Sequence, residues 1–485
     1  MRVLAAVDLG AQSGRVAVGR FDGSRLAVSE AHRFANEPIE ESGRLRWDIR
    51  RLYAEALDGL RAAGHVDSVA VDSWAVDFGL LDRSGALVEN PVHYRDARRA
   101  AAAPTVFARV PPRELYDRTG IQLLPINSVF ELAAMAADRD PAFDAAERLL
   151  LVPDLFHHWL CGSRTSEFTN ATTTQCFDPN ARAWAADLLE RLEIPVRLFP
   201  EVVEPGTQLG RVAVDGLGSA IVVAAATHDT GSAVAAVPFR SPGSVFLSVG
   251  TWSLVGVEVE SPVITDATYA ANLTNEGGVA GTFRLLRNVT GLWLLHECRR
   301  AWAAQGLELS FDELVELARA APPLRSFVDP NAEVFLEPGD MPSRIRAFCR
   351  ETNQPEPTDA GATARCVLES LALKHAGTVD ALRRAAGVDP AELHVVGGGA
   401  RNELLCKWTA DAAGLPVLAG PEEATLLGNL LVQAMALGEL STLDEARDVV
   451  RASFAPRTYE PDDDAVWQEA RERFARLGAD VEVAV

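Results

Sequence analysis

The chain has 485 residues, a formal net charge of −22 and 48% hydrophobic residues. At roughly 100–200 residues per domain, this length predicts two or three domains with a large core. So acidic a chain argues against nucleic-acid binding, which needs Lys and Arg to neutralise phosphates. No run of about 18 apolar residues occurs, and Asp8 interrupts the apolar N-terminal stretch. We therefore expect a cytoplasmic protein with no membrane span and no signal peptide.

Cysteine and lysine usage narrows the chemistry further. The six cysteines form no C-x-x-C pair and no zinc spacing, so reduced, mostly buried thiols are expected, with Cys349 and Cys366 as the pair to inspect for proximity. Lys374 and Lys407 are the only lysines, and neither follows a glycine as a P-loop requires. Phosphate transfer by this chain would therefore depend on backbone N–H groups, hydroxyls, arginine and a metal ion.

The first elements predicted along the chain are two strands joined by a glycine turn. Residues 3–9 are apolar, residues 10–14 form the turn, and residues 15–21 alternate as the second strand. A helix is expected from an N-cap at Asp48 to a stop at Gly64, followed by a buried strand over 68–71. Residues 93–131 are rich in polar and aromatic side chains and turn signals, so we expect them to cover a pocket.

A similar pattern recurs later in the chain, about 240 residues on. A strand over 220–226 leads into a short helix, and the Pro/Gly-rich stretch 238–244 is typical of a domain boundary. Strands over 244–249 and 252–258 then flank a second turn. The paired hairpins suggest a duplicated α/β domain. The remaining predicted elements are a strand at 394–396, three glycines at 397–399, and helices over 401–413 and 462–477.

Three glycine turns are candidates for binding a nucleotide. The first hairpin turn can aim successive N–H groups at one anion, with the Ser13 hydroxyl and the Arg15 guanidinium beside it. Asp8, at the end of the first strand, could hold Mg²⁺ through water. The turn at 250–251 presents amides and a hydroxyl again, and residues 397–399 allow close backbone approach to a ligand. Each has a structural alternative, which is a plain hairpin for the first two and close strand–helix packing for the third.

Asp229 is the candidate general base. A carboxylate at a strand end can accept the proton of an attacking hydroxyl, as in other phosphoryl transferases, although an N-cap aspartate is the alternative. His228 alone indicates only a structural histidine. A further polar and aromatic group has the composition of a sugar site, with loop residues and ion pairs as the alternative. This group comprises Trp74, Asp77, Tyr94, Arg95, Asp96, Arg98, Gln122 and Asn127.

Taken in order, the motifs of residues 7–438 resemble those of the FGGY carbohydrate kinases, and within that family most closely the members that act on L-rhamnulose. They are VDLGAQSGR (7–15), LRWD (45–48), VDSWAVDF (71–78), YRDAR (94–98), TGIQLLPIN (119–127), NATTTQ (170–175), THDT (227–230), GTWSL (250–254), NLTNEGG (272–278), NVTGLWLL (288–295) and VGGGARN (396–402). Single motifs are short, but their order across most of the chain makes the match specific.

The resemblance implies a fold and a reaction. The fold is α/β, with two ribonuclease-H-like, actin-like ATPase domains and a nucleotide and sugar cleft between them. Residues 1–241 would hold the sugar site, the first phosphate hairpin and the catalytic aspartate, and residues 242–485 the second hairpin, the glycine turn and the C-terminal helix. The implied reaction transfers the γ-phosphate of ATP to the 1-hydroxyl of L-rhamnulose in rhamnose catabolism, with Mg²⁺ as cofactor.

The same resemblance implies a role for each matching residue, with Asp229 as the proton acceptor. ATP would contact Ala11, Gln12, Ser13, Gly14, Arg15, Thr251, His296, Gly398 and Asn402. The sugar would contact Ala75, Asp77, His228, Asp229, Thr230 and Asn288. Two positions depart from the family pattern. Ala75 replaces a glycine, so its methyl could narrow the sugar pocket, and His296 replaces a glutamine at an ATP contact.

Other functions compete with this one. An NAD-dependent oxidoreductase would use the turn at 397–399 with Glu422 or Glu423 on the ribose, but Asn402 stands where the fingerprint needs its last glycine. A non-catalytic sugar sensor would often have lost its base, and Asp229 is present. Kinases of L-fuculose, L-xylulose or a similar ketose remain open. The expected partners are therefore a ketose and ATP, without nucleic acid or membrane, and both a monomer and a weak dimer stay open.

Overall fold

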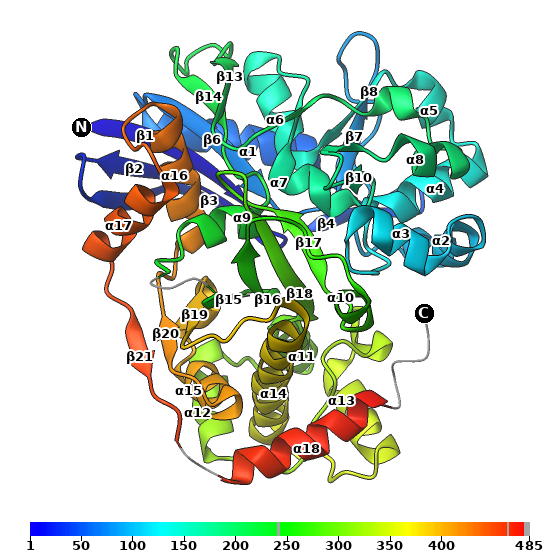
Figure 1. Cartoon of the computed structure of the whole chain (residues 1–485), viewed down its shortest axis with the longest axis vertical. Coiled ribbons are helices and arrows are strands. Elements are labelled where there is room, and N and C mark those ends of the chain that lie inside the picture. Colours follow the sequence, from blue (N-terminus) through cyan, green and yellow to red (C-terminus); the bar gives the residue numbers. More distant parts are fainter. Residues whose placement is uncertain (240–242, 463–464, 480–485) are drawn as a thin grey trace. The chain divides into compact units, whose positions relative to one another are not determined.

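The computed structural model describes residues 1–239, 243–462 and 465–479, which form two compact units (Figure 1). Unit 1 comprises Met1–Pro238, Glu258–Leu285 and Glu423–Phe454. Unit 2 comprises Phe239–Val257, Leu286–Glu422 and the chain from Ala455 onward. Each unit is therefore assembled from segments that are distant in the sequence. The boundary expected between residues 241 and 242 lies outside the described residues.

Unit 1 is built on a six-stranded sheet with the order β13-β14-β6-β1-β2-β3. β1, β2 and β3 are antiparallel neighbours, whereas β6 runs parallel to β1 and β14 runs parallel to β6. The carboxyl ends of β1, β6 and β14 therefore meet at one edge, where open α/β sheets hold their ligands. The strands are β1 (Arg2–Leu9), β2 (Ser13–Phe21), β3 (Leu26–Ala35), β6 (Ser68–Ser73), β13 (Thr207–Arg211) and β14 (Ile221–Ala224).

Helices cover both faces of this sheet. A Cβ on Gly59 of α1 (Ile49–Ala63) would lie 2.7 Å from Cβ of Val16, so this helix packs directly on β2. A Cβ on Gly19 would lie 2.8 Å from Leu430 of α16 (Ala424–Ala436). Because side chains alternate along a strand, positions 16 and 19 point to opposite faces, and the two helices cover opposite faces.

The predicted limits of α1 are confirmed. The side chain of Asp48 caps its first turn by accepting a hydrogen bond from the N–H of Arg51, at 3.3 Å. Gly64 ends the helix with a φ of 74°, a left-handed conformation that glycine adopts without strain. Buried residues at helical spacing then fix the face that packs on the sheet.

Residues 93–131 contain more helix than their turn signals predicted. They form α2 (Ala97–Arg109), α3 (Pro112–Thr119) and the start of α4 (Ser128–Asp138). The Asp96 side chain caps α2, and the alanines that follow favour a helix once it has begun. The apolar sides of these helices pack with β7 and β8 into one core cluster.

The remaining elements of the N-terminal part are short. They are β4 (Pro38–Glu41), β5 (Arg44–Trp47), β7 (Phe78–Leu81), β8 (Arg148–Leu151), β9 (Ser166–Glu167), β10 (Phe177–Asp178), β11 (Ala183–Trp184), β12 (Val202–Val203), α5 (Pro141–Ala145), α6 (Val152–Cys161), α7 (Phe168–Ala171), α8 (Ala186–Arg191) and α9 (Asp229–Ala235). Unit 1 also contains α10 (Asp266–Ala270) and α17 (Leu443–Ser453).

A second sheet has the order β17-β18-β16-β15-β19-β20-β21. Its central strand β15 is antiparallel to β16 and parallel to β19, which in turn is parallel to β20. The order β18-β16-β15-β19-β20 thus repeats the order β3-β2-β1-β6-β14, which confirms the duplication predicted from the two hairpins. The strands are β15 (Val245–Val249), β16 (Trp252–Val259), β17 (Thr274–Gly277), β18 (Phe283–Thr290), β19 (Leu393–Val396), β20 (Val417–Ala419) and β21 (Arg457–Tyr459).

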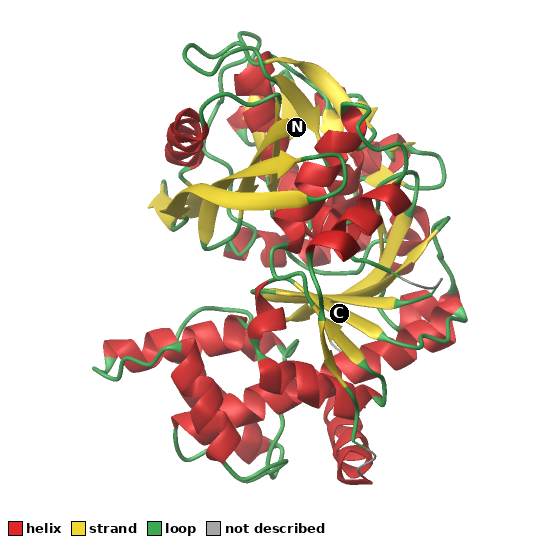
Figure 2. Ribbon diagram, turned by 90° about the vertical axis from the view of Figure 1, so that its left-hand side faces the viewer, coloured by secondary structure: helices red, strands yellow, loops and turns green. Residues whose placement is uncertain are grey.

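Unit 2 is rich in helices, which are drawn in red in Figure 2. They are α11 (Trp293–Ala304), α12 (Phe311–Ala320), α13 (Met341–Glu351), α14 (Ala360–Ala386), α15 (Glu403–Ala413) and α18 (Ala465–Ala479). Within the described ranges, no helix is both long enough and apolar enough to span a bilayer.

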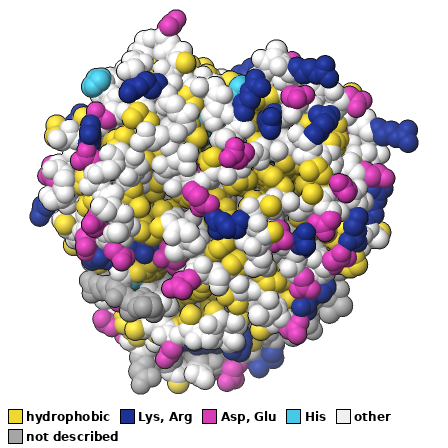
Figure 3. All heavy atoms as spheres, turned by 45° about the horizontal axis from the view of Figure 1, so that its top comes forward, with side chains coloured by type: hydrophobic (Ala, Val, Ile, Leu, Met, Phe, Trp, Pro, Cys, Tyr) yellow, Lys and Arg dark blue, Asp and Glu magenta, His cyan; other side chains and the backbone are white. Residues whose placement is uncertain are grey.

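The cysteines follow the prediction from composition. All six cysteines are free thiols in buried or half-buried positions. Cys349 and Cys366 are neighbours, and the hydrogen bond between their thiols lowers the pKa of Cys349. On the face drawn in Figure 3, basic side chains lie scattered among acidic ones and form no continuous basic patch.

Candidate active site

The first hairpin turn is held by a buried side chain, Asn36. Nδ2 of Asn36 donates to the carbonyl of Gly10 at 2.8 Å, and its backbone N–H donates to the carbonyl of Gln12 at 3.0 Å. In a planar trans peptide the N–H points opposite to the C=O. The N–H groups of Ala11 and Ser13 therefore both point away from Asn36, which is the arrangement that binds one anion.

Arg15 of this hairpin is already balanced by acids. It lies opposite Asp8 in the β1–β2 register and contacts Oδ2 of Asp8 at 2.8 and 2.9 Å. It also pairs with Glu423, which the returning C-terminal segment brings into unit 1. Burial opposes its charge, but Asp8 and Glu423 outweigh burial and raise the pKa of Arg15. A phosphate at this hairpin would therefore meet backbone amides and the Ser13 hydroxyl rather than an unpaired arginine.

Three aspartates gather at the carboxyl edge of the first sheet. Asp8 and Asp72 are register partners on β1 and β6, and Asp229 follows β14. Burial, then the charge of Asp8, raise the pKa of Asp72 well above that of a free aspartate, and Asp229 adds to this. Nδ2 of Asn429 donates to Asp72 at 2.6 Å and partly offsets the burial. Three carboxyl groups are thus crowded beside the hairpin, and this crowding favours a proton on Asp72.

This edge suits Mg²⁺, which prefers carboxylate, water and phosphate oxygens. Asp8 uses Oδ2 for Arg15, so its other oxygen is not engaged by that ion pair. Across the described residues, no group of three or more His, Cys, Asp or Glu side chains is placed to hold a metal ion directly. An ion here would need water or phosphate oxygens as further ligands, as a water-mediated role for Asp8 requires.

Asp229 is the first residue of α9, whose N-cap position is taken by His228. Its Oδ1 accepts hydrogen bonds from the backbone N–H and the hydroxyl of Thr230, the latter at 3.0 Å. About a third of the side chain (32%) is exposed, in contrast to the buried Asp72. Burial raises the pKa of Asp229, His228 opposes that rise, and Asp8 adds to it. A partly exposed carboxylate of raised pKa is suited to accept a proton.

The two expected sugar contacts on the segment after β6 differ in their surroundings. Ala75 is half-buried, and its carbonyl accepts from the N–H of Asp77 at 2.9 Å. The residue between them, Val76, has a φ of 65°, so the segment is a γ-turn that strains a β-branched residue. The hydroxyl of Ser128 donates to the carbonyl of Val76 at 2.5 Å and helps to hold it. Such strain is found most often at functional sites.

Asp77 itself points into the protein, where its carboxylate has protein partners on both oxygens. Oδ2 accepts from the indole N–H groups of Trp47 and Trp74, at 2.6 and 2.9 Å, and from the N–H of Tyr94 at 3.2 Å. Oδ1 pairs with Arg99 at 2.6 Å. Burial raises the pKa of Asp77, and Arg99 opposes this. Asp77 thus organises an aromatic wall, in which the Trp47 and Trp74 rings lie 4.1 Å apart.

Several other members of the predicted polar group also make structural contacts. Asp96 caps α2 and accepts from the N–H of Leu45 at 2.9 Å, and Arg98 pairs with Glu131 at 3.2 Å. Asn127 donates to Gln175 at 2.8 Å. The alternative of loop contacts and ion pairs therefore accounts for these side chains.

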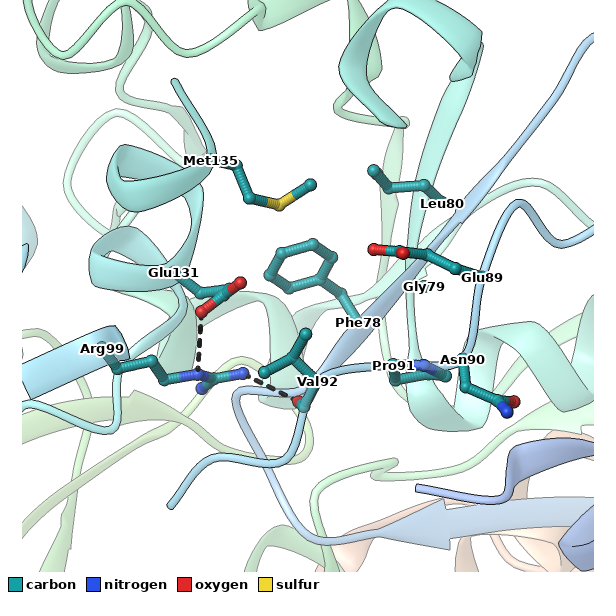
Figure 4. A pocket seen from close by; sticks show the side chains of 10 residues that line it. All are labelled: Phe78, Gly79, Leu80, Glu89, Asn90, Pro91, Val92, Arg99, Glu131 and Met135. Atoms are coloured by element: carbon teal, nitrogen blue, oxygen red, sulfur yellow. Dashed lines mark hydrogen bonds and ion pairs between the residues drawn. The ribbon is translucent and has the colours of Figure 1, made fainter. Parts of the chain in front are cut away.

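A small cavity of about 20 Å³ lies beside this group, in Figure 4. In Figure 4, Arg99 lies between Glu131 and Val92. Its Nε is 3.9 Å from Oε2 of Glu131, and its Nη2 donates to the carbonyl of Val92 at 3.2 Å. The other lining residues are Phe78, Gly79, Leu80, Glu89, Asn90, Pro91 and Met135. Its volume is that of a single water molecule, so it is too small for a sugar.

In unit 2 the second hairpin turn and the glycine turn meet at the end of β15. The carbonyl of Thr251 accepts from the N–H of Gly291 at 3.0 Å. A Cβ on Gly399 would overlap the side chain of Val249, so close packing accounts for this glycine. Gly398, by contrast, is exposed, and none of the described atoms outside its neighbourhood lies within 4 Å of an added Cβ. Gly398 is thus the position of this turn that a ligand can approach.

The other expected contacts of unit 2 occupy defined places. His296 lies in α11, 4.8 Å from the ring of Phe311, and burial, followed by the charge of Arg299, lowers its pKa to about 4. It is therefore neutral at pH 7 and can still donate one hydrogen bond. Asn402 caps α15 by accepting from the N–H of Leu405 at 3.0 Å. The carbonyl of Asn288, on β18, accepts from Asn331 at 3.3 Å.

Sequence reasoning missed several residues that shape this site, namely Asn36, Asp72, Glu276, Arg284 and Asn429. Asp72 and Glu276 belong to the motifs at 71–78 and 272–278, so their motifs could have drawn attention to them. Asn36 and Asn429 carry no local signal, because only the folded chain brings them to the hairpin and to Asp72.

Comparison with known proteins places this geometry in a family. Residues 3–236 match the N-terminal domain of the FGGY family of carbohydrate kinases, and residues 245–437 match its C-terminal domain. A rhamnulokinase from Bacteroides thetaiotaomicron is 42% identical over 474 residues, 96% of this chain and 97% of that protein. A rhamnulokinase from Enterobacter sp. strain 638 is 40% identical and covers 95% of each chain.

Solved structures show the same fold at low identity. A ligand-bound xylulose kinase from Lactobacillus acidophilus superposes with a TM-score of 0.82 at 16% identity, over 100% of this chain and 99% of that one. Glycerol kinase from Plasmodium falciparum, solved with ADP, superposes with a TM-score of 0.79 at 14% identity and the same coverage. The two-domain, actin-like α/β fold predicted from the sequence is thereby confirmed.

Proposed function

The chain belongs to the FGGY family of carbohydrate kinases, and on that premise we propose that it phosphorylates L-rhamnulose at the 1-hydroxyl. The products would be L-rhamnulose 1-phosphate and ADP. The observation that carries the choice of sugar is the identity of 40–42% to proteins named rhamnulokinase, over nearly the whole of each chain. The xylulose and glycerol kinases share only the fold, at 14–16% identity.

In the proposed reaction, the phosphates of ATP lie against the N–H groups of Ala11 and Ser13. Neither lysine competes for this role, because Lys374 pairs with Asp329 at 2.9 Å and Lys407 with Asp411 at 2.6 Å. Mg²⁺ on the ATP phosphates would supply charge neutralisation as the phosphoryl group moves. Asp8 would hold that ion through water.

Asp229 takes the proton of the attacking sugar hydroxyl. The hydroxyl oxygen forms a bond to the γ-phosphorus as the bond from phosphorus to ADP breaks, and Asp229 later returns the proton to water. General-base assistance of this kind is worth about 10²–10⁴-fold. Because the base must be ionised, turnover should fall as the pH drops through the raised pKa of Asp229.

The remaining assignments rest on matching motif positions. We propose that Ala75, His228, Thr230 and Asn288 contact the sugar, and that Gln12, Gly14, Arg15, Thr251, His296, Gly398 and Asn402 border the nucleotide. For Arg15 and Asp77, the roles expected from the sequence take a narrower form. Arg15 would act by orienting Asp8, because its guanidinium is already paired. Asp77 would act on the sugar only through the aromatic wall that it holds.

An ADP-release assay over a panel of ketoses tests the proposed substrate. The panel should contain L-rhamnulose, L-fuculose and L-xylulose, which differ by one stereocentre or methyl group. A methyl group is worth about 1–3 kcal/mol, or roughly 10–200-fold in kcat/KM. We expect L-rhamnulose to have the highest kcat/KM by at least about tenfold. A higher value for another ketose would reassign the substrate, and no ketose-dependent ADP release would refute the kinase activity.

A further inference from the structure

A chain of three buried ionisable side chains lies directly behind Asp229. Nε2 of His228 is 3.4 Å from Oδ1 of Asp229, and Nδ1 of His228 is 3.2 Å from Oε2 of Glu276. The guanidinium of Arg284 reaches both, with Nη2 3.2 Å from Nδ1 of His228 and Nη1 3.2 Å from Oε2 of Glu276. All four residues belong to unit 1.

The three side chains behind Asp229 are buried, whereas the side chain of Asp229 is partly exposed. Arg284 is fully buried, and His228 and Glu276 are 5% and 4% exposed. The Asp229 side chain alone is open, at 32%. A substrate can therefore reach Asp229, whereas Glu276 and Arg284 can influence the reaction only through their neighbours.

Glu276 is held in place through its two neighbours in the sequence, Asn275 and Gly277. The backbone N–H of Asn275 donates to the carbonyl of Gly120 at 2.8 Å, and that of Gly277 donates to the hydroxyl of Thr172 at 2.8 Å. A Cβ on Gly277 would lie 2.6 Å from the ring of Phe168, so the strand cannot shift toward α7. Nε of Arg284 donates to the carbonyl of Gly277 at 2.8 Å.

The backbone of His228 is equally fixed. Oε2 of the buried Glu167 accepts from the N–H and the hydroxyl of Thr227 at 2.9 and 2.7 Å. The N–H of His228 itself lies 3.2 Å from the hydroxyl of Thr169. The backbone that carries the imidazole is therefore held by Glu167 and Thr169, and the ring itself is held by Glu276 and Arg284.

We propose that Glu276, with Arg284, is a positioning residue that holds His228 against the catalytic carboxylate of Asp229. The inference rests on the proposed role of Asp229 as the base. Nδ1 of His228 faces both an acceptor on Glu276 and a donor on Arg284, so either protonation state of that nitrogen has a partner. In both states Nε2 can carry a proton toward Oδ1 of Asp229. The carboxylate is thereby kept in one orientation toward the sugar hydroxyl.

The charges around this chain set the direction of a pH effect. His228 is flanked by Asp229, Glu276 and Arg284, and Asp229 also faces Asp8 and Asp72. On its far side Arg284 faces Glu167 and Glu258. Glu276 holds the imidazole at the place where it opposes the raised pKa of Asp229. Without Glu276 this opposition weakens, so the pKa of Asp229 should rise further.

The decisive experiment is a double-mutant cycle of Glu276→Gln and His228→Asn, read by the pH profile of kcat/KM. Since His228 opposes the raised pKa of Asp229, each single variant should move the acidic limb to higher pH, by about one unit. kcat should fall about tenfold or more. In the His228→Asn background, Glu276→Gln should cause no further shift, because Glu276 acts through His228.

Matched variants separate positioning from a loss of stability. Glu276→Asp keeps the negative charge, so its acidic limb should lie closer to the wild-type pH than that of Glu276→Gln. Glu369→Gln removes another buried carboxylate, which pairs with Arg365 at 2.7 Å in unit 2, and should leave the limb unchanged. Thermal midpoints of all variants show whether each one is folded.

Two results would overturn the proposal. One is an unmoved acidic limb in a folded Glu276→Gln variant, and the other is an equal effect of that change with and without His228. Wild-type enzyme that releases no ADP with any ketose would instead refute the proposed function, so the two failures are distinguishable.

Discussion

Asn36 shows how one buried side chain can shape the turn that we propose binds the ATP phosphates. Its contacts with the carbonyls of Gly10 and Gln12 turn the intervening amides to the opposite side. Asn36 lies on the segment that follows β3. Its burial costs little free energy, because the side chain carries no charge.

Replacing Asn36 with alanine should weaken ATP binding. The Nδ2 hydrogen bond to Gly10 is lost, and a hydrogen bond is worth about 0.5–1.5 kcal/mol, or roughly 2–12-fold in affinity. We expect the KM for ATP to rise within that range while the KM for the sugar is unchanged. Asn180→Ala on the surface is the control. Equal increases in both KM values would show a general loosening of unit 1 instead.

A substitution of Asp77 distinguishes a structural role of this residue from direct binding of the sugar. Asp77→Asn removes the nearer of the two acids that pair with the buried Arg99, at 2.6 Å, and leaves Glu131 at 3.9 Å. Removal of one partner from a buried pair costs up to about 3–5 kcal/mol. Urea unfolding should therefore show a loss of that size, accompanied by a higher KM for the sugar. Unchanged stability with a higher KM would make Asp77 a direct sugar ligand, contrary to its contacts with Trp47 and Trp74.

At the scale of elements, the glycine turn at 397–399 combines two different demands. Gly399→Ala must displace Val249 on β15, and overpacking of this kind costs about 1–3 kcal/mol. Gly398→Ala meets no such obstacle. We expect the first variant to lower the thermal midpoint, and the second to keep stability within about 0.5 kcal/mol while raising the KM for ATP. A destabilised Gly398→Ala with unchanged KM would contradict the nucleotide role of Gly398.

Elements with local signals were predictable from the sequence. α1 has its cap at Asp48 and its stop at Gly64, and the hairpin strands alternate around glycine turns. Residues 93–131 misled the prediction because polar and aromatic residues of helices α2 and α3 resemble a turn-rich loop. In the site, the sequence predicted Asp229 between a strand and a short helix, where the structure has it as the first residue of α9, but the sequence could not show that Asp77 points inward. That orientation depends on Arg99 and two tryptophans from other segments.

At the scale of the whole molecule, the duplicated domain could be predicted from the sequence, but the exchange of segments between the two units could not. Each sheet has a hairpin whose spacing recurs in the sequence. Residues 258–285 and 423–454 belong to unit 1 although they follow the second hairpin. These segments bring Glu276, Arg284 and Asn429 to the aspartates, so part of the site is supplied from far along the chain. This arrangement depends on contacts between residues that are distant in the sequence, so no local sequence pattern predicts it.

Acid stability should depend on neutral buried histidines, of which His375 on α14 is the clearest. It is fully buried, and neither ring nitrogen has a hydrogen-bond partner within the described ranges. Burial lowers its pKa from 6.5 to about 3. Because the folded pKa is depressed, the stability it contributes is present above pH 6.5 and is lost as the pH falls toward 3.

His375→Leu should therefore reduce the pH dependence of unfolding. Between pH 7 and pH 5, one such histidine accounts for about 2 kcal/mol of lost stability. Urea unfolding at the two pH values should show that the variant loses less than the wild type by about this amount. His65→Leu, at an exposed position, should behave like the wild type. Identical losses in His375→Leu and wild type would mean that His375 is charged or solvated in the folded state.

The central claim is that Asp229 accepts the proton of the sugar hydroxyl, and Asp229→Asn tests it most directly. Asparagine keeps the size and the contact with Thr230 but cannot serve as a base. In the ADP-release assay with L-rhamnulose, kcat should fall by at least about 10²-fold, with the KM for ATP nearly unchanged. Turnover close to that of the wild type in a folded Asp229→Asn variant would contradict the account.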